Sequence, residues 1–463
     1  MAKEKKFGLF ELISFLVTGI IVLDTFVAPA ALGASAITLW IIVAVLFMIP
    51  NGFINAELGG AYPDGLVAWV KESMGEFHAT IVGWFYWVNV AFWMPAVFIV
   101  FTYWFSMAFF PDGEGWTTLG SFGMIVIALV ACWGLILTVR RGIELGVLLG
   151  KISTIIKIFV LLLLGILGIL YTGDSAGEVF RNTSWSLDFS DLTTIGLVTA
   201  IVFNLLGFEL IASIGNRVKN PEKTIPRAVI LGALLIAGLY IFATFGILRV
   251  ATVADLADEG FILDGFYLSL QRMTTIFGGA SDIVFKGIMA ITLFTLIANM
   301  ISWVIGANEI LEDADFAKTM PIFNERHPKY GTLSKSYIMM GIISSILILI
   351  GLGLGDTGAE AFWTILAFSM VIFIFPYIYL SPAVLILRKK DGLANKEFVI
   401  PGGKVGLWAS AILNFIFIGL SVILLFTSNQ GYDLYYPVVI IGTIVTLGAG
   451  LYFYYRGRKM VKQ

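Results

Sequence analysis

Gly19-Ile-Ile-Val-Leu-Asp24-Thr25 and Phe203-Asn204-Leu-Leu-Gly207-Phe-Glu209 are two short stretches, each inside a long apolar segment, that interrupt it with polar or helix-weakening residues. Pro29 follows the first of them. A carboxylate at the centre of a bilayer costs about 3 kcal/mol or more unless it is paired or hydrated, so such residues are rarely there without a function. We therefore expect the helices that carry these two stretches to be broken near mid-membrane.

The composition around these stretches is that of a membrane protein. Of 463 residues, 59% are hydrophobic and only 13% are charged, and the mean hydropathy is +0.94. This excludes a soluble globular enzyme, and repeated runs of 18 or more nearly uncharged residues predict an all-α integral membrane fold. About twelve transmembrane helices are expected, at residues 10–32, 37–60, 79–109, 118–139, 147–171, 192–215, 226–250, 282–309, 335–355, 361–387, 405–427 and 434–455.

The two interrupted segments are the first and the sixth of these spans, so they are five spans apart. Broken helices at corresponding positions of two five-helix halves are typical of inverted-repeat transporters, whose site lies between the breaks at the midplane. The alternative is that these glycines only allow close helix packing, since the chain has 49 glycines.

Charged residues indicate the orientation of the spans, because cytoplasmic loops are enriched in Lys and Arg. The loops expected inside carry Lys3, Lys5, Lys6, Arg140, Arg141, Arg217, Lys219, Lys223, Arg227, Lys318, Arg326, Lys329, Arg388, Lys389, Lys390, Arg456, Arg458 and Lys459. The alternate loops carry the acids Asp112, Glu114, Asp174, Glu178, Asp188, Asp191, Asp255, Asp258, Glu259 and Asp264. We expect a multi-pass protein of the cytoplasmic membrane with both termini cytoplasmic.

Several other functions are disfavoured by what the sequence lacks. One cysteine, Cys132, and two histidines, His78 and His327, are too few for a transition-metal site, so no metal and no cofactor are expected. The same scarcity leaves no convergent catalytic set for an enzyme. No Walker-type Gly-x-x-x-x-Gly-Lys-Ser/Thr stretch is present, so transport would be secondary. The segregated charges give no indication of a nucleic-acid partner.

Several motifs occur in one order along the chain: Val17-Thr-Gly-Ile with Ala28-Pro29-Ala, Ala56-Glu57-Leu-Gly with Tyr62-Pro63, Gly207-Phe208-Glu209, Lys219-Asn220-Pro221-Glu-Lys-Thr-Ile-Pro226-Arg227, Trp303 with Ala307, Pro376-Tyr377-Ile-Tyr379 and Ile400-Pro401-Gly402-Gly403-Lys404. In this ordered set the sequence resembles the amino acid–polyamine–organocation superfamily of transporters over nearly its whole length. The last two motifs make it similar to precursor/product antiporters, of the agmatine/putrescine and glutamate/γ-aminobutyrate types. Tyr62-Pro-Asp-Gly-Leu-Val departs from the family pattern, which has a Gly-Gly pair after the proline.

The resemblance implies a LeuT-like fold of five plus five helices in inverted repeats, with two more helices at the C-terminus and transport by alternating access. The ten-helix core would cover residues 1–400, with repeats at about 10–171 and 192–388. Residues 401–463 would form the two additional transmembrane helices and a cytoplasmic tail. The protein would bind a small amine or amino acid and the lipid bilayer, and whether it forms a homodimer is left open.

Asp24 lies where related carriers have a glycine-rich break that receives the substrate carboxylate. A carboxylate at this position would repel such a group and attract an amine. We therefore expect Asp24, with Thr25 beside it, to bind an ammonium group that has no adjacent carboxylate, as in putrescine or agmatine. The alternative is that Asp24 only bonds to the backbone of the break.

Three residues are candidates for proton coupling or gating. The resemblance places Glu209 where the family has a glutamate often linked to proton coupling, although this residue could instead satisfy unwound backbone N–H groups. Lys157 corresponds to a span-five lysine that replaces sodium in several proton-coupled relatives, with a snorkelling base as the alternative. Trp93, in the third span, is the third candidate.

The remaining binding candidates are aromatic or amide side chains. An ammonium over an aromatic ring gains roughly 0.5–2 kcal/mol when desolvated. Phe203, Trp303 and Tyr377 are expected at the site by family position, Trp87 could line the same cavity, and Asn89 and Asn204 would accept hydrogen bonds from N–H donors. With 38 Phe, 16 Tyr and 12 Trp in the chain, packing is the alternative for each ring.

The predicted function is that of a secondary transporter. The preferred prediction is an agmatine/putrescine-type antiporter with Asp24 as the ammonium anchor. The alternative is an amino acid antiporter or proton symporter of the tyrosine/tyramine or glutamate/γ-aminobutyrate type. A channel would need a repeated filter or a ring of charges, which the sequence does not contain. A nutrient sensor without transport is a further alternative.

Overall fold

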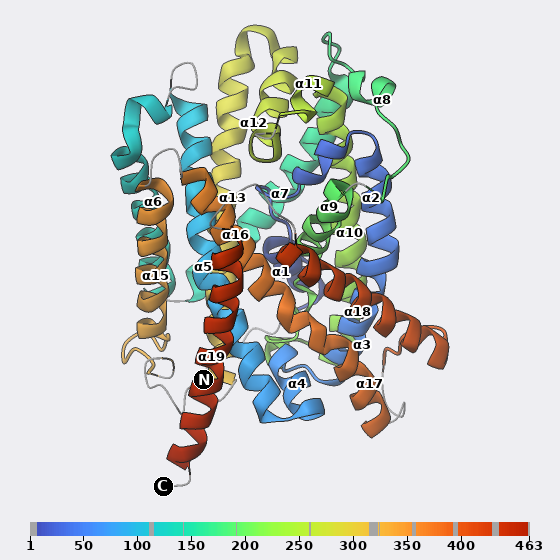
Figure 1. Ribbon diagram of the computed structural model, residues 1–463, viewed down its shortest axis with the longest axis vertical. Coiled ribbons are helices and arrows are strands. Elements are labelled where there is room, and N and C mark those ends of the chain that lie inside the picture. The colour runs from blue at the N-terminus through green and yellow to red at the C-terminus, as the bar shows by residue number, and fades with distance from the viewer. Residues whose placement is uncertain are drawn as a thin grey trace.

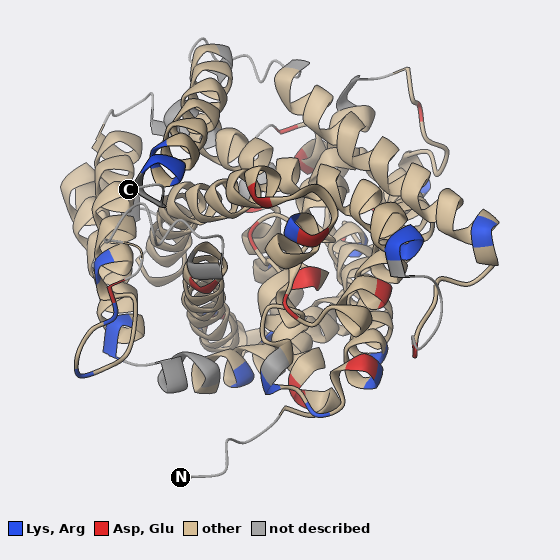
Figure 2. Cartoon of the chain, turned by 90° about the horizontal axis from the view of Figure 1, so that it is seen from below, with Lys and Arg blue, Asp and Glu red and all other residues tan. Residues whose placement is uncertain are grey.

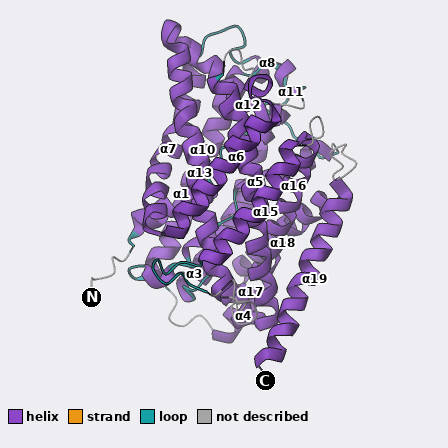
Figure 3. Cartoon of the chain, turned by 90° about the vertical axis from the view of Figure 1, so that its left-hand side faces the viewer, coloured by secondary structure: helices purple, strands orange, loops and turns teal. Residues whose placement is uncertain are grey.

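The computed structural model describes residues 7–110, 115–141, 143–190, 192–258, 261–313, 323, 325–353, 358–391, 397–427 and 435–461. Within these residues the chain is a bundle of helices without strands (Figures 1 and 3), which confirms the predicted all-α membrane fold. Several of the predicted loop charges, Lys3, Lys5, Lys6, Asp112, Glu114, Asp191, Glu259 and Lys318, lie outside the described residues.

The α-helices are labelled as in Figure 1. They are α1 (Leu9–Ile20), α2 (Ser35–Val43), α3 (Ile49–Ala61), α4 (Leu66–Met74), α5 (Glu76–Phe109), α6 (Gly115–Arg141), α7 (Ile143–Leu170), α8 (Glu178–Asn182), α9 (Leu192–Asn204), α10 (Pro221–Val250), α11 (Val253–Leu256), α12 (Phe261–Thr274), α13 (Ser281–Asp313), α15 (Ser334–Gly353), α16 (Gly358–Ile374), α17 (Leu380–Asp391), α18 (Gly403–Thr427) and α19 (Tyr435–Val461).

Both predicted interruptions are present. Helix α1 ends at Ile20, residues 21–27 are not helical, and the chain resumes in a short 3₁₀ helix, η1 (Ala28–Leu32). Helix α9 ends at Asn204, and after residues 205–207 the chain forms the 3₁₀ helix η4 (Phe208–Ile211). The inverted repeat that these breaks suggest stays a prediction.

Gly207 explains where the second break falls. Its φ is +116°, a conformation that side chains with a Cβ rarely adopt. A Cβ built here would also lie 3.0 Å from Cγ1 of Ile20, at the end of α1. The two breaks are therefore in direct contact, and a larger residue at position 207 would push them apart.

Eleven helical segments of the described chain are long and apolar enough to cross a membrane, where the sequence predicted about twelve. The difference arises at the first predicted span, because the break leaves only the 12-residue helix α1 as an α-helix. The tenth predicted span is also irregular, since α16 gives way to the 3₁₀ helix η9 (Phe375–Tyr379), with Pro376 near its start, before α17.

Helix α5 is central to the bundle, and packs against α6, α13, α15 and α16. Helix α10 packs against α1, α3 and α7 and so borders the first break. In Figure 1, α4 and α17 lie at the lower end and α8, α11 and α12 at the upper end. Seen from below in Figure 2, most of the ribbon is tan, as expected when charges are few.

The lower end is joined by contacts among segments predicted to lie inside. The backbone of Phe7 pairs with Arg217 and Lys219, just before α10. Glu57 of α3 forms a buried ion pair with Arg388 of α17, and accepts a 2.8 Å hydrogen bond from the backbone N–H of Ile400. These contacts give Glu57 a structural role at the end of α3.

A buried amide ladder attaches α18 to the bundle. The Nδ2 of Asn51 in α3 donates to Oδ1 of Asn414 over 2.8 Å, and Nδ2 of Asn414 donates to the hydroxyl of Ser381 in α17 over 3.0 Å. Both asparagines are fully buried. Because an unpaired amide is costly within a membrane, these bonds hold α18 in one register against α3 and α17.

Candidate functional site

The carbonyl groups at the C-terminal end of α1 point into the first break, where the helix offers them no partner. Side chains from three other helices satisfy them. Lys157 of α7 donates to Thr18 and Ile21, Trp303 of α13 donates to Gly19 over 2.8 Å, and Tyr240 of α10 donates to Ile20 over 3.1 Å. The break is thus held by α7, α10 and α13 together.

Lys157 is 1% exposed, which excludes the alternative of a base that reaches out to the interface. Its ammonium has three N–H groups, and three acceptors surround it: the carbonyls of Thr18 and Ile21 and the Oδ1 of Asn299, at 2.8 Å. The positive charge also lies at the negative end of the α1 dipole. All three N–H groups of Lys157 therefore have hydrogen-bond acceptors within the protein.

Asp24 lies in the same break and is 8% exposed. It interacts electrostatically with Lys157, but the hydrogen bonds of that lysine go to other groups. Among the described residues, Oδ1 of Asp24 is buried without a hydrogen-bond partner. A buried carboxylate oxygen in this state can accept a hydrogen bond from a cationic donor.

Thr25 and Asn204 connect the two breaks. The hydroxyl of Thr25 donates to Oδ1 of Asn204 over 2.9 Å, and Nδ2 of Asn204 donates to the carbonyl of Ala200 over 2.8 Å. The two residues predicted as ligands are therefore bonded to each other in this structure. A substrate that uses the Asn204 oxygen would have to compete with Thr25 for it.

Glu209, in η4, is 1% exposed and accepts two phenol hydrogen bonds at Oε1. Tyr86 of α5 donates over 2.7 Å and Tyr377 of η9 over 2.6 Å, while Oε2 is buried without a hydrogen-bond partner among the described residues. Glu209 and Tyr377, which were predicted separately, are thus in direct contact. Tyr86 is a member of the site that the sequence did not indicate.

Four of the five predicted aromatic residues, Trp93, Phe203, Trp303 and Tyr377, belong to one cluster of rings next to Glu209. Trp93 packs edge-to-face on Phe203 and Trp303, with centroids 5.7 and 5.4 Å apart. Phe373 of α16 packs edge-to-face on Phe203, Trp303 and Tyr377, at 5.2–5.4 Å. Phe373 was not predicted, although it lies one helical turn before Tyr377.

Two residues of α5 make other contacts. Asn89 accepts a hydrogen bond from Ser369 of α16 over 2.8 Å, and its Nδ2 is buried without a partner among the described residues. Trp87 stacks on Trp84, and its indole N–H is directed to Asn308 and Ser336. Among the described residues, the ring of Trp87 packs on Trp84 and Phe323, and its place beside the site stays a prediction.

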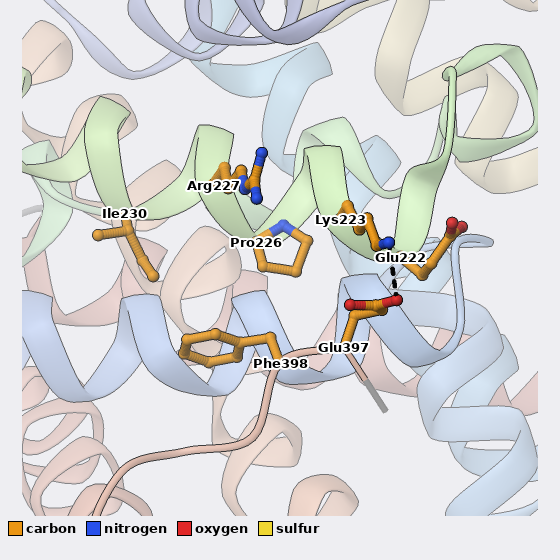
Figure 4. Close-up of a pocket in the computed structure, with 7 residues that line it drawn as sticks. All are labelled: Glu222, Lys223, Pro226, Arg227, Ile230, Glu397 and Phe398. Atoms are coloured by element: carbon orange, nitrogen blue, oxygen red, sulfur yellow. Dashed lines mark ion pairs between the residues drawn. The ribbon is translucent and has the colours of Figure 1, made fainter. Parts of the chain in front are cut away.

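All eleven predicted site residues are at most 8% exposed, so the site is closed to solvent. A surface pocket lies elsewhere, at the start of α10 (Figure 4), and is lined by Glu222, Lys223, Pro226, Arg227, Ile230, Glu397 and Phe398. The exposed pair Lys223–Glu397, at 3.1 Å, crosses it. In the described residues no group of three or more His, Cys, Asp or Glu side chains could hold a metal ion.

Two interrupted helices that meet inside a membrane bundle, with buried carboxylates at both interruptions, are the architecture of a secondary transporter. Comparison with known sequences agrees, because the amino acid permease family profile matches residues 7–449. The chain therefore belongs to the amino acid permease family, within the superfamily that its motifs resemble.

Several curated relatives are named as transport proteins. The chain is 30% identical to a probable agmatine/putrescine antiporter of Lactococcus lactis subsp. lactis, over 91% of this chain and 88% of that protein. It is 23% identical to a glutamate/γ-aminobutyrate antiporter of the same organism, over 92% and 84%. It is 27% identical to a serine/threonine exchanger of Bacillus subtilis, over 56% and 58%.

The family membership settles the class of function. The protein is a multi-pass membrane transporter of a small molecule, and it is not an enzyme.

Proposed function

We propose that the protein is an antiporter that exchanges small organic cations, of the agmatine/putrescine type, with Asp24 as the anchor for an ammonium or guanidinium group. The observation that carries the proposal is the hydrogen bonding of the Asp24 carboxylate. Its Oδ1 is buried without a hydrogen-bond partner among the described residues, and the nearby Lys157 already donates to Thr18, Ile21 and Asn299.

The chemistry of the second break supports a substrate with two cationic ends. Glu209 also has a buried oxygen, Oε2, without a hydrogen-bond partner among the described residues, and the ring cluster of Trp93, Phe203 and Trp303 packs beside it. Aromatic faces and carboxylates both attract desolvated cations. Asn89, Asn204 and Thr25 would supply further polar contacts, and Tyr377 would reach the substrate from η9.

The transport cycle that we propose is alternating access without ATP. Residues 1–400 would form the ten-helix core and residues 401–463 the two additional helices and tail. Glu209 would gate the exchange through its protonation, with Lys157 fixing the first break in place of a metal cation and Trp93 closing the ring cluster. Both termini would face the cytoplasm, since the basic segments near Phe7, Arg217 and Arg388 gather at one end.

The test is uptake of radiolabelled putrescine, agmatine, tyrosine and glutamate into liposomes that are preloaded with each compound in turn. We expect putrescine and agmatine to stimulate each other's uptake from the opposite side. Asp24→Asn should abolish this exchange, because it removes the anchoring charge. Asp282→Asn is a matched control, since Asp282 is exposed at the start of α13 and pairs with Lys286.

An amino acid antiporter is the second candidate, favoured by the likeness to a glutamate/γ-aminobutyrate antiporter over nearly the whole chain. Asp24 would then contact only the α-amine. Two results would overturn the role of Asp24 as the ammonium anchor. One is that the protein exchanges amino acids but does not transport diamines. The other is that amine exchange persists in Asp24→Asn.

A further inference from the structure

Tyr240 bonds to the backbone on both sides of Ile21, at the point where the chain leaves α1 and enters the first break. Its hydroxyl donates to the carbonyl of Ile20, the last residue of α1, and accepts a 2.8 Å hydrogen bond from the backbone N–H of Val22. Lys157 and Trp303 bond only to carbonyl groups there. The phenol of Tyr240 therefore replaces the helical hydrogen bonds that the chain gives up where it leaves α1.

The ring of Tyr240 is fixed as firmly as its hydroxyl. It is fully buried and stacks between Trp40 of α2, at 5.0 Å, and Phe26 of the break, at 5.6 Å, with interplanar angles near 25°. Phe26 in turn packs against Phe266 of α12. The stack leaves the hydroxyl little freedom to choose another partner, so the position of residues 20–22 is set by α10.

Asp24 lies two residues beyond Val22, and its charge acts on the phenol of Tyr240. Without the hydroxyl, the carbonyl of Ile20 and the N–H of Val22 would both be unpaired in a buried, apolar environment. Such groups seek other partners because each unpaired one is costly. The break would then rearrange, and Asp24 would rearrange with it.

We propose that Tyr240 is a positioning residue for substrate binding: through Ile20 and Val22 it holds the first break in the conformation that directs Asp24 toward the cationic end of the substrate. The inference rests on the proposed role of Asp24 as the ammonium anchor. Tyr240 itself would not contact the substrate.

The experiment is a double-mutant cycle on Tyr240→Phe and Asp24→Asn in purified full-length protein. Putrescine binding would be followed by tryptophan fluorescence, and exchange would be measured in liposomes. Tyr240→Phe should raise the Kd and the KM about tenfold, equivalent to about 1.4 kcal/mol, with kcat largely kept. In the Asp24→Asn background, Tyr240→Phe should have little further effect on Kd, because Tyr240 affects binding only by positioning Asp24.

Tyr267→Phe is the matched control, since Tyr267 is also buried and its hydroxyl donates to one backbone carbonyl, that of Met107, over 3.2 Å. It should leave Kd unchanged. An unchanged Kd in Tyr240→Phe, or additive effects of the two substitutions, would overturn the role of Tyr240. Unchanged amine binding in Asp24→Asn would instead overturn the proposed anchor, so the two failures are distinguishable.

Discussion

The ammonium of Lys157 and the carbonyl of Thr18 are 2.7 Å apart, which joins the middle of α7 to the last turn of α1. The lysine acts here as a structural cation for a broken helix, because it neutralises carbonyl groups that the break leaves without helical partners. The proposed substrate site next to it would therefore depend on a charge that does not have to bind substrate.

The first prediction concerns this cation. Lys157→Ala should abolish exchange, because the carbonyls of Thr18 and Ile21 lose their donor, and wild-type exchange should be the same in sodium and in choline media. Uptake into liposomes checks both. Lys151→Ala, six residues earlier on the exposed face of α7, should keep wild-type exchange. Sodium-stimulated uptake by the wild type would contradict the idea that Lys157 replaces a metal cation.

The second prediction concerns Glu209. In Glu209→Gln the side-chain oxygen can still accept hydrogen bonds from Tyr86 and Tyr377, but the amide group cannot ionise. The exchange rate should therefore depend less on pH. Rates would be measured across about pH 5–8 with equal pH on both sides. Glu72→Gln, which changes an exposed carboxylate of α4, should keep the wild-type profile. The gating role fails if the profile of Glu209→Gln matches that of the wild type.

The third prediction concerns the ion pair between Glu57 and Arg388, which are 1% and 9% exposed. Removing one partner of a buried pair costs about 3–5 kcal/mol, so Glu57→Gln should lower the melting temperature of the purified protein clearly. Glu72→Gln breaks an exposed pair with Lys390, worth about 0–1 kcal/mol, and should hardly change it. Equal melting temperatures for the two variants would argue against a stabilising role of Glu57.

The fourth prediction concerns Asp255, in α11 at the upper end. Burial alone would raise the pKa of this carboxyl, but hydrogen bonds from Arg272 and Thr252 outweigh it and hold the pKa below its ordinary value. A lowered pKa in the folded state gives stability that is present above the unfolded pKa and is lost as pH falls through the folded one.

Asp255→Asn should therefore reduce the melting temperature at neutral pH, and the difference from the wild type should shrink below about pH 4. Melting curves from about pH 3 to pH 7 would measure this. A difference that stays constant over that range would mean that the ion pair with Arg272 is not its cause.

The fifth prediction concerns orientation. Cys132 is the single cysteine in the sequence and is fully buried, so an added surface cysteine gives a clean signal. An impermeant maleimide should label Ser184→Cys, in the exposed segment after α8, in intact cells. It should label Lys390→Cys, at the end of α17, only after the cells are opened. The reverse pattern would place the termini outside.

The two breaks could be predicted because Asp24 and Glu209 stand out in apolar surroundings, and the order of the motifs identified the family. Tyr86, Phe373 and Tyr240 could not be singled out, because aromatic residues are common in this chain and carry no local signal. Tyr240 contacts residues about 220 positions away, which only the tertiary structure brings together.

The direction of the Trp87 side chain follows from the geometry of α5. On α5, Asn89 follows Tyr86 by three residues and Trp93 follows it by seven, so the three side chains lie on one face of that helix. Trp87 is one residue from Tyr86 and therefore points about 100° away, toward Trp84 and Asn308. The helical period thus directs Trp87 away from the face of α5 that carries Tyr86, Asn89 and Trp93.

The amide ladder of α18 has a consequence for the making of the protein. Asn51 and Asn414 are 363 residues apart, so α3 is synthesised long before the partner of its buried amide exists. Until α18 is inserted, the side-chain oxygen of Asn51 can already accept a hydrogen bond from Asn55 on the same helix, but its Nδ2 lacks the acceptor that Asn414 provides. A chain that is cut short before α18 would therefore keep an unpaired amide donor inside the bilayer, which is costly.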